Sequence, residues 1–158
     1  MSLSTRSSFQ TDSAASYRAL TNVECRSWLC DHDEGRLGYQ TGRGLRAVVT
    51  RYRVIDDVVV LVLPEYNEIC QYAPERTITL TVSALTDNDT FTEVVVTGMG
   101  HLADNEPLLD EATEQIEHWP TGVTTHTVRL DLTKLEGSVW SWRTEPVPIR
   151  HARSLQRV

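Results

Sequence analysis

The stretch LRAVVTRYRVIDDVVVLVL, residues 45–63, decides the fold class expected for this chain. Its first part, residues 45–55, is rich in β-branched side chains and is typical of one long strand. The pair Asp56-Asp57 then makes a tight turn, and the apolar run 58–63 returns as the next strand. Together with a strand expected at 35–40, this hairpin predicts a meander of three strands.

Alternation along the long strand sorts its arginines onto two faces. Arg46 shares one face with Val48 and Thr50, whereas Arg51 shares the other with Val49. Two interpretations stand side by side: the arginines form ion pairs with acidic residues of the chain, or Arg46 or Arg51 binds a phosphate through the bidentate geometry of the guanidinium group. Only one of the two faces can line a given pocket, unless a bulge intervenes.

Further strand signals follow the meander. They cover residues 77–85, 91–102, 124–132 and 137–142. In the second of these segments, Gly98 and Gly100 indicate a bulge or a close approach of another backbone. Many strands joined by short turns predict a mainly β protein, a small antiparallel barrel with helices at its rims.

A helix is expected before the meander. Thr21 and Glu24 have the spacing of a capping box, in which each residue satisfies an amide of the other at the start of a helix. The helix should run to about residue 32. It should direct Val23, Trp28 and Leu29 toward the core.

The remaining segments complete the expected organisation. Residues 1–16 are rich in serine and threonine and should form a disordered tail. The folded domain should span residues 17–145, and residues 146–158 should form a basic C-terminal tail. Within the domain we expect a short helical segment at 68–73 and an acidic helix at 105–118 with a solvated face.

Composition narrows the class of function. The 158 residues carry 15 Lys+Arg and 22 Asp+Glu, a net charge of −7, which argues against binding to nucleic acid or to an anionic membrane surface. The longest aliphatic run is too short to cross a bilayer, and the N-terminus lacks the apolar core of a secretory signal. Three cysteines without framework spacing favour a reducing cytoplasm.

Metal and acid–base chemistry have weak signals. Cys25, Cys30 and His32 do not converge on one ion at helical spacing, so no metal site is predicted. His101 and His126 fall in strands, either as half-buried residues with hydrogen-bond partners or as catalytic groups. No side chain stands out as a general acid or base, and no catalytic residue is assigned. Trp140 and Trp142 share a strand face and would close the core, line a planar ligand or form a subunit interface.

The order and spacing of these segments resemble those of the pyridoxamine 5′-phosphate oxidase-like proteins, the FMN-binding split-barrel family. The resemblance covers roughly residues 20–142. The segments that carry it are the leading capped helix, the strand Gly35–Gly38, the strand Arg46–Tyr52 with its Asp56-Asp57 hairpin, the return Val58–Leu63, the strand Val94–Gly98, the acidic helix ending at Trp119-Pro120, and the closing pair Val128–Leu130 and Glu136-Gly137.

The resemblance implies an antiparallel six-stranded split barrel with flanking helices, which forms a homodimer and holds FMN in the grooves between subunits. The implied function is a flavin-dependent oxidoreductase that uses FMN or a deazaflavin on a small-molecule substrate whose identity stays open. The residues implied to contact the flavin are Arg46, Val48, Val49, Thr50, Arg51, Tyr66, Asn67, Trp140 and Trp142. Arg46 and Arg51 are expected at its phosphate.

One departure from the family pattern leaves an alternative open. After the second strand of the hairpin the family usually supplies a small hydroxyl residue and a lysine to the phosphate, whereas this chain has Asn67 and Glu68. A carboxylate repels a phosphate dianion. The alternative hypothesis is therefore a dimeric split barrel without flavin, a non-catalytic binding or regulatory module. A third hypothesis is an unrelated barrel that binds a hydrophobic ligand.

Overall fold

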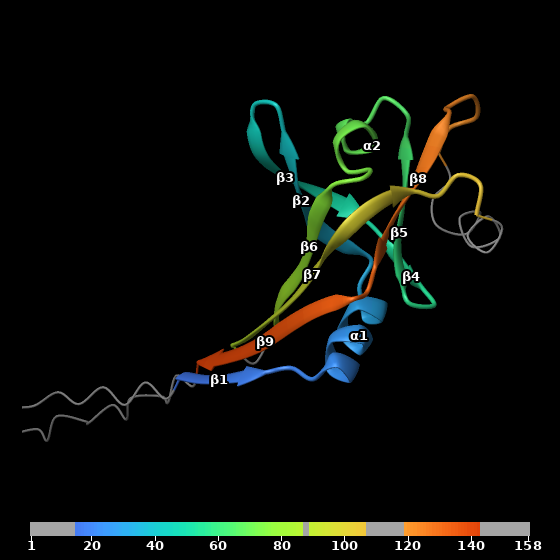
Figure 1. Ribbon diagram of the computed structural model, residues 1–158. Coiled ribbons are helices and arrows are strands. Elements are labelled where there is room, and N and C mark those ends of the chain that lie inside the picture. The colour runs from blue at the N-terminus through green and yellow to red at the C-terminus, as the bar shows by residue number, and fades with distance from the viewer. Residues whose placement is uncertain (1–14, 87–88, 107–118, 143–158) are drawn as a thin grey trace, which may run out of the picture.

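The computed structural model describes residues 15–86, 89–106 and 119–142, and these residues form a bent antiparallel sheet with two helices (Figure 1). The strands are β1 (Ala15–Ala19), β2 (Glu34–Thr41), β3 (Gly44–Arg51), β4 (Arg53–Ile55), β5 (Val58–Pro64), β6 (Thr77–Thr86), β7 (Thr90–Leu102), β8 (Thr125–Asp131) and β9 (Lys134–Trp142). The helices are α1 (Asn22–Asp31) and α2 (Glu68–Tyr72).

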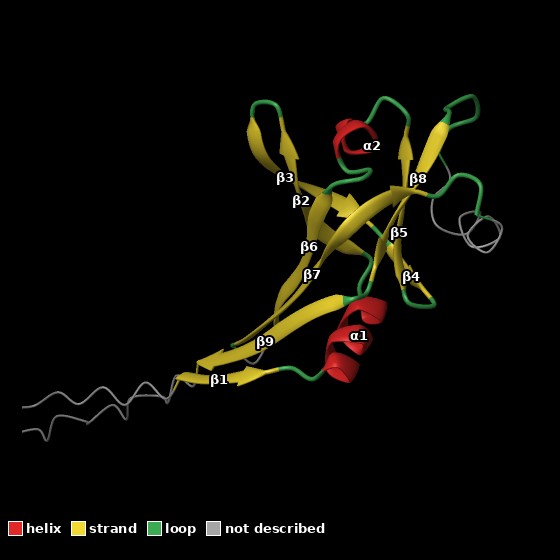
Figure 2. Cartoon of the chain, viewed as in Figure 1, coloured by secondary structure: helices red, strands yellow, loops and turns green. Residues whose placement is uncertain are grey.

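The strand order confirms the mainly β, antiparallel split-barrel fold. The path runs β3-β2-β6-β7-β8-β5-β4, with β9 beside β7 and β1 beside β9, and the sheet does not close into a ring. Figure 2 shows the long strands crossing the middle of the molecule with one helix near each end. The described residues contain nine strands, because the predicted long strand is divided and the edge strand β1 is added.

The long strand predicted at 45–55 is broken at Tyr52, and the three-stranded meander is therefore wrong. β3 pairs with β2, whereas β4 pairs with β5 in the other half of the barrel. At the corner the Tyr52 amide donates to the Asp33 carbonyl and the Tyr52 hydroxyl donates to the Leu29 carbonyl, each at 2.8 Å. Tyr52 is buried, so these bonds fix the bend from inside the protein.

The capped helix is confirmed. The Thr21 hydroxyl accepts from the Glu24 amide, and the Glu24 carboxylate accepts from the Thr21 amide at 2.8 Å. Leu29 is fully buried and Trp28 packs at the edge of the core, but Val23 is 77% exposed. Val23 lies in the first turn, on the solvent side of the helix, so its predicted core position is wrong.

The core lies between the two curved halves of the sheet. It is formed by the inward side of β2, β5, β6, β7 and β8, with Leu37, Leu61, Leu80, Val96 and Leu130 each fully buried. Cys25 and Leu29 of α1 are buried and close one end of the core. At the other end Ile69 of α2 is buried against the same core, which anchors the short helix expected at 68–73.

Gly100 of β7 marks a close approach of another backbone, as predicted, whereas Gly98 lies closest to a side chain, that of Leu130. A Cβ atom at Gly100 would lie 2.5 Å from the carbonyl oxygen of Ala73, just after α2. Gly100 also accepts from the Glu75 amide at 2.8 Å and donates to the Arg76 carbonyl at 2.9 Å. The segment that follows α2 is thus held directly against β7.

The ends of the chain are described only in part. β1 begins at Ala15, before the domain start predicted at residue 17, and pairs with β9. The rest of the two predicted tails, and residues 107–118 of the predicted acidic helix, lie outside the described residues. Neither α1 nor α2 has the length and apolar character required of a membrane-spanning helix.

Candidate functional site

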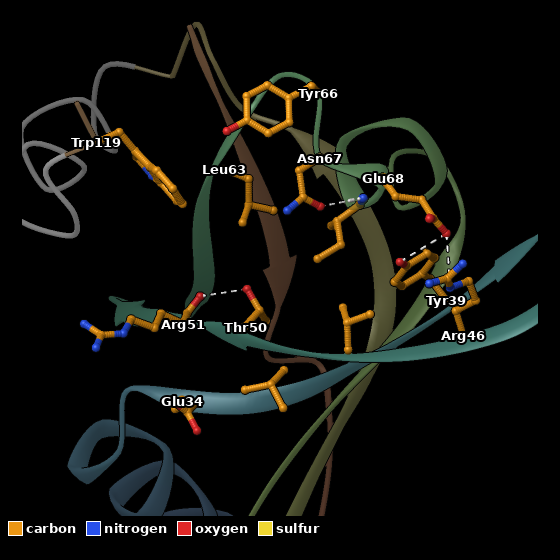
Figure 3. Close-up of a pocket in the computed structure, with 13 residues that line it drawn as sticks. Glu34, Tyr39, Arg46, Thr50, Arg51, Leu63, Tyr66, Asn67, Glu68 and Trp119 are labelled. Carbon is orange, nitrogen blue, oxygen red and sulfur yellow. Dashed lines mark hydrogen bonds and ion pairs between the residues drawn. The ribbon is translucent and has the colours of Figure 1, made fainter. Parts of the chain in front are cut away.

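A cavity of about 510 Å³ opens between β3 and the turn that leads into α2 (Figure 3). This volume lies within the range of roughly 300–1,000 Å³ that is usual for small-molecule sites. The residues that line it are Glu34, Tyr39, Arg46, Val48, Val49, Thr50, Arg51, Leu63, Tyr66, Asn67, Glu68, Ile69 and Trp119. They include each residue expected at a flavin except Trp140 and Trp142.

The register of β2 and β3 explains how β3 contributes to the cavity. Arg46 and Val48 lie opposite Tyr39 and Leu37, which face the core, so Arg46, Val48 and Thr50 share the inner face. Val49 and Arg51 alternate onto the outer face and border the cavity at its rim. Figure 3 shows the Arg51 side chain extending away from the cavity, while Arg46 lies beside Glu68.

A charged cluster forms one end of the cavity. Glu68 Oε1 lies 3.4 Å from Arg46 Nε and accepts a hydrogen bond from the Tyr39 hydroxyl at 3.4 Å. Burial, and next the nearby Glu68 charge, raises the pKa of Tyr39, so the phenol stays protonated and remains a donor. Because the arginine and glutamate side chains are 54% and 36% exposed, the pair adds little stability. Its effect is on the charge that a ligand would meet.

The turn before α2 supplies the upper wall. Asn67 caps the helix, since its side-chain oxygen accepts a hydrogen bond from the Ile69 backbone amide at 2.9 Å. The backbone amide of Asn67 donates to the Pro64 carbonyl at 2.8 Å. With its oxygen engaged, Asn67 keeps its amide NH2 as a donor for a ligand. Tyr66 is 78% exposed above the opening, and Figure 3 shows its ring over the cavity.

The opposite end is closed by Trp119. Its indole Nε1 donates to the Val62 carbonyl of β5 at 3.1 Å, which fixes the ring against the barrel. In the sequence, Trp119 is predicted only as the end of a helix, and four other lining residues, Glu34, Tyr39, Leu63 and Ile69, are not predicted at the site. Tyr39 could have been found, because alternation in the β2–β3 hairpin places it opposite Arg46.

Trp140 and Trp142 do not line this cavity. They lie on the part of β9 that pairs with β1, where the Tyr17 and Trp140 rings meet with centroids 4.6 Å apart. Figure 1 shows this end of β9 well separated from β3 and α2. Both tryptophans remain about half exposed, so they do not close the core either.

The two strand histidines have carboxylate partners outside the cavity. His101 Nδ1 lies 3.2 Å from Glu75, and His126 Nδ1 lies 2.7 Å from Asp104. Both histidines are partly buried, which fits the interpretation as half-buried residues with hydrogen-bond partners. Within the described ranges no three His, Cys, Asp or Glu side chains gather as metal ligands would.

Comparison by sequence finds no relative: no protein-family model matches the chain, and no curated protein matches it. Comparison by structure does. A FAD-binding protein of Mycobacterium smegmatis superposes with a TM-score of 0.66 at 20% identity, over 78% of this chain and 97% of that one. A pyridoxamine 5′-phosphate oxidase-like protein of Corynebacterium glutamicum superposes with a TM-score of 0.69 at 13% identity, over 82% and 96%.

A third similar structure is a FAD-binding protein of Mesorhizobium loti, with a TM-score of 0.62 at 16% identity over 80% of this chain and 98% of that one. These likenesses cover nearly the whole of each known structure. The chain has the split-barrel fold that flavin-binding and pyridoxamine 5′-phosphate oxidase-like proteins share.

Proposed function

We propose that the chain is a flavin-dependent oxidoreductase that binds its flavin in the cavity between β3 and α2. The observation that carries this proposal is the composition of the cavity wall. Apolar side chains cover its floor, aromatic rings stand at two sides, and a few polar groups converge at one end. A planar ring system with a polar chain suits such a site.

The residues fit a flavin in the following way. Val48, Leu63 and Ile69 offer an apolar surface, and Tyr66 and Trp119 offer ring faces against which an isoalloxazine could stack. Arg46 and Asn67 offer donors to the polar chain, and the Tyr39 hydroxyl oxygen offers an acceptor. When bound, the flavin supplies the electron or hydride transfer, and the protein supplies position and electrostatic environment. The family resemblance implies FMN, with a deazaflavin as the alternative.

Similar proteins support the same proposal. Two of the structures that share the fold are FAD-binding proteins, and another is the flavocytochrome Anf3 of Azotobacter vinelandii, with a TM-score of 0.59 at 16% identity. The fold therefore recurs with flavins at low sequence identity.

A second candidate function is a flavin-less binding or regulatory module. The observation that favours it is the ion pair between Glu68 and Arg46. Arg46 is expected to bind a phosphate, but it is already paired with the Glu68 carboxylate. The two candidates differ in a property that is simple to measure.

The test is the visible absorbance spectrum of the freshly purified protein, repeated after incubation with flavin and desalting. A flavin-dependent enzyme should retain the yellow chromophore, and Val48→Phe should abolish retention because Val48 faces the cavity. Val23→Phe is the matched control, since the same substitution falls on an exposed helix position. Protein that stays colourless under both conditions favours the flavin-less module.

We further propose that the protein is a cytoplasmic homodimer. The register places Leu45, Val49, Met99, Trp140 and Tyr17 on one outer face of the sheet, and each is at least 43% exposed. A second copy that covers this face would bury them. Light scattering at micromolar concentration should give twice the monomer mass, and Trp140→Glu should reduce it. The three free cysteines suit a reducing compartment.

A further inference from the structure

Each of the two arginines that line the cavity has a glutamate residue as a neighbour in the fold. Arg46 is paired with Glu68 at 3.4 Å, and Arg51 lies directly opposite Glu34 in the register of β2 and β3. These are the charged residues among those that line the cavity, so their formal charges cancel. A ligand entering the cavity meets no net positive charge.

The polar end of the cavity is also mismatched to a phosphate in its hydrogen bonding. An ionised carboxylate such as Glu68 can only accept hydrogen bonds, and a phosphate dianion can also only accept them. A hydroxyl group is different, because it can donate to Glu68 and at the same time accept from Arg46. The cluster therefore fits a neutral polyol better than a phosphate ester.

We propose that this cavity selects a flavin with an uncharged ribityl chain, riboflavin, over the phosphate-bearing FMN and FAD, and that Glu68 is the residue that sets this preference. The inference rests on the proposed flavin binding and specifies the class of flavin. Glu68 acts on specificity and is not assigned to the redox chemistry.

The test compares the dissociation constants of riboflavin and FMN, measured by quenching of flavin fluorescence in wild-type protein, Glu68→Gln and Glu65→Gln. Wild type should bind riboflavin at least about tenfold more tightly than FMN, since the phosphate dianion would lose water contacts without meeting a net positive charge in the cavity. Glu68→Gln should tighten FMN binding by about the same factor. Glu65→Gln is the matched control, because it removes the same charge from an exposed position three residues away that does not line the cavity.

Ionic strength provides a second measurement that needs no variant. Salt screens the repulsion between the FMN phosphate and Glu68, so FMN should bind more tightly at high salt while riboflavin affinity stays constant. The opposite trend, FMN weakened by salt, would mean that the site attracts phosphate and would overturn the inference.

The outcomes separate this inference from the function on which it rests. If FMN binds as tightly as riboflavin, or if Glu68→Gln and Glu65→Gln change FMN affinity equally, the specificity inference fails while flavin binding stands. If neither flavin binds the wild-type protein, both fail. Riboflavin binding by each variant shows that the variant is folded.

Discussion

A substitution at Gly100 tests whether close packing against β7 holds α2, and with it one wall of the candidate site, in place. The substitution Gly100→Ala adds a Cβ atom 2.5 Å from the Ala73 carbonyl oxygen and 3.0 Å from Ile78 Cδ1. Carbon and oxygen atoms do not approach to 2.5 Å without a bond, so the backbone after α2 must move away from β7. That backbone leads directly from the helix that carries Glu68 and Ile69.

The magnitude follows from how firmly this backbone is held. Two hydrogen bonds of 2.8 and 2.9 Å tie Gly100 to Glu75 and Arg76, so the segment cannot retreat without weakening them. Inserting a methyl group into such a packed contact costs about 1–3 kcal/mol, and the backbone obstacle places this case at about 2–3 kcal/mol. For a domain of this size the melting temperature should fall by roughly 4–12 °C.

The assay is thermal unfolding followed by circular dichroism, with two matched substitutions. Gly42→Ala should leave the melting temperature nearly unchanged, because a Cβ there meets nothing within 4 Å. Gly98→Ala should fall between the two, since its Cβ meets the end of the Leu130 side chain at 2.9 Å, and a side chain can rotate. If Gly100→Ala melts within about 2 °C of wild type, the close approach does not hold α2 in place.

Four further predictions concern three features: the helix cap, the core and a buried cysteine. Thr21→Ala should cost about 1 kcal/mol of unfolding free energy in urea titrations. A hydrogen bond from Arg18, followed by one from the Thr21 backbone, lowers the pKa of Glu24 from 4.5 to about 2. Glu24→Gln should therefore lower the free energy of unfolding at neutral pH. The difference in this free energy between the variant and wild type should vanish as the pH falls from 4.5 toward 2. Leu61→Ala should cost about 2–5 kcal/mol in the same titrations, since Leu61 is fully buried; a smaller loss would place it outside the core. Burial raises the pKa of Cys70 to about 11, so peptide mass spectrometry after alkylation at neutral pH should find the exposed Cys30 modified well before Cys70.

Local motifs made part of this structure predictable from the sequence. The capping box of Thr21 and Glu24 depends on residues three apart, and the register of β2 and β3 follows from a short turn and alternation. The same alternation shows which residues of β3 share a face, although it does not show which face turns toward the cavity. The resemblance to split-barrel proteins added the overall architecture, which local patterns do not specify.

The features that sequence reasoning missed depend on contacts between distant segments. The break at Tyr52 is fixed by the carbonyls of Leu29 and Asp33, which no pattern within residues 45–55 reveals. Trp119 reaches the cavity because its indole bonds to the carbonyl of Val62, 57 residues earlier. Trp140 and Trp142 are side chains of the kind that often line ligand sites. The pairing of β9 with β1 places them away from the cavity.

β7 joins the two halves of the barrel, and this has a consequence for how the protein unfolds. Along one edge β7 pairs with β6; along the other it pairs first with β9, through Thr90–Thr97, and then with β8, through Gly100–Leu102. Separating either half therefore removes hydrogen-bonded neighbours from a strand that the other half also needs. The barrel should lose its structure in one cooperative transition, with no stable half-molecule between the native and the unfolded chain.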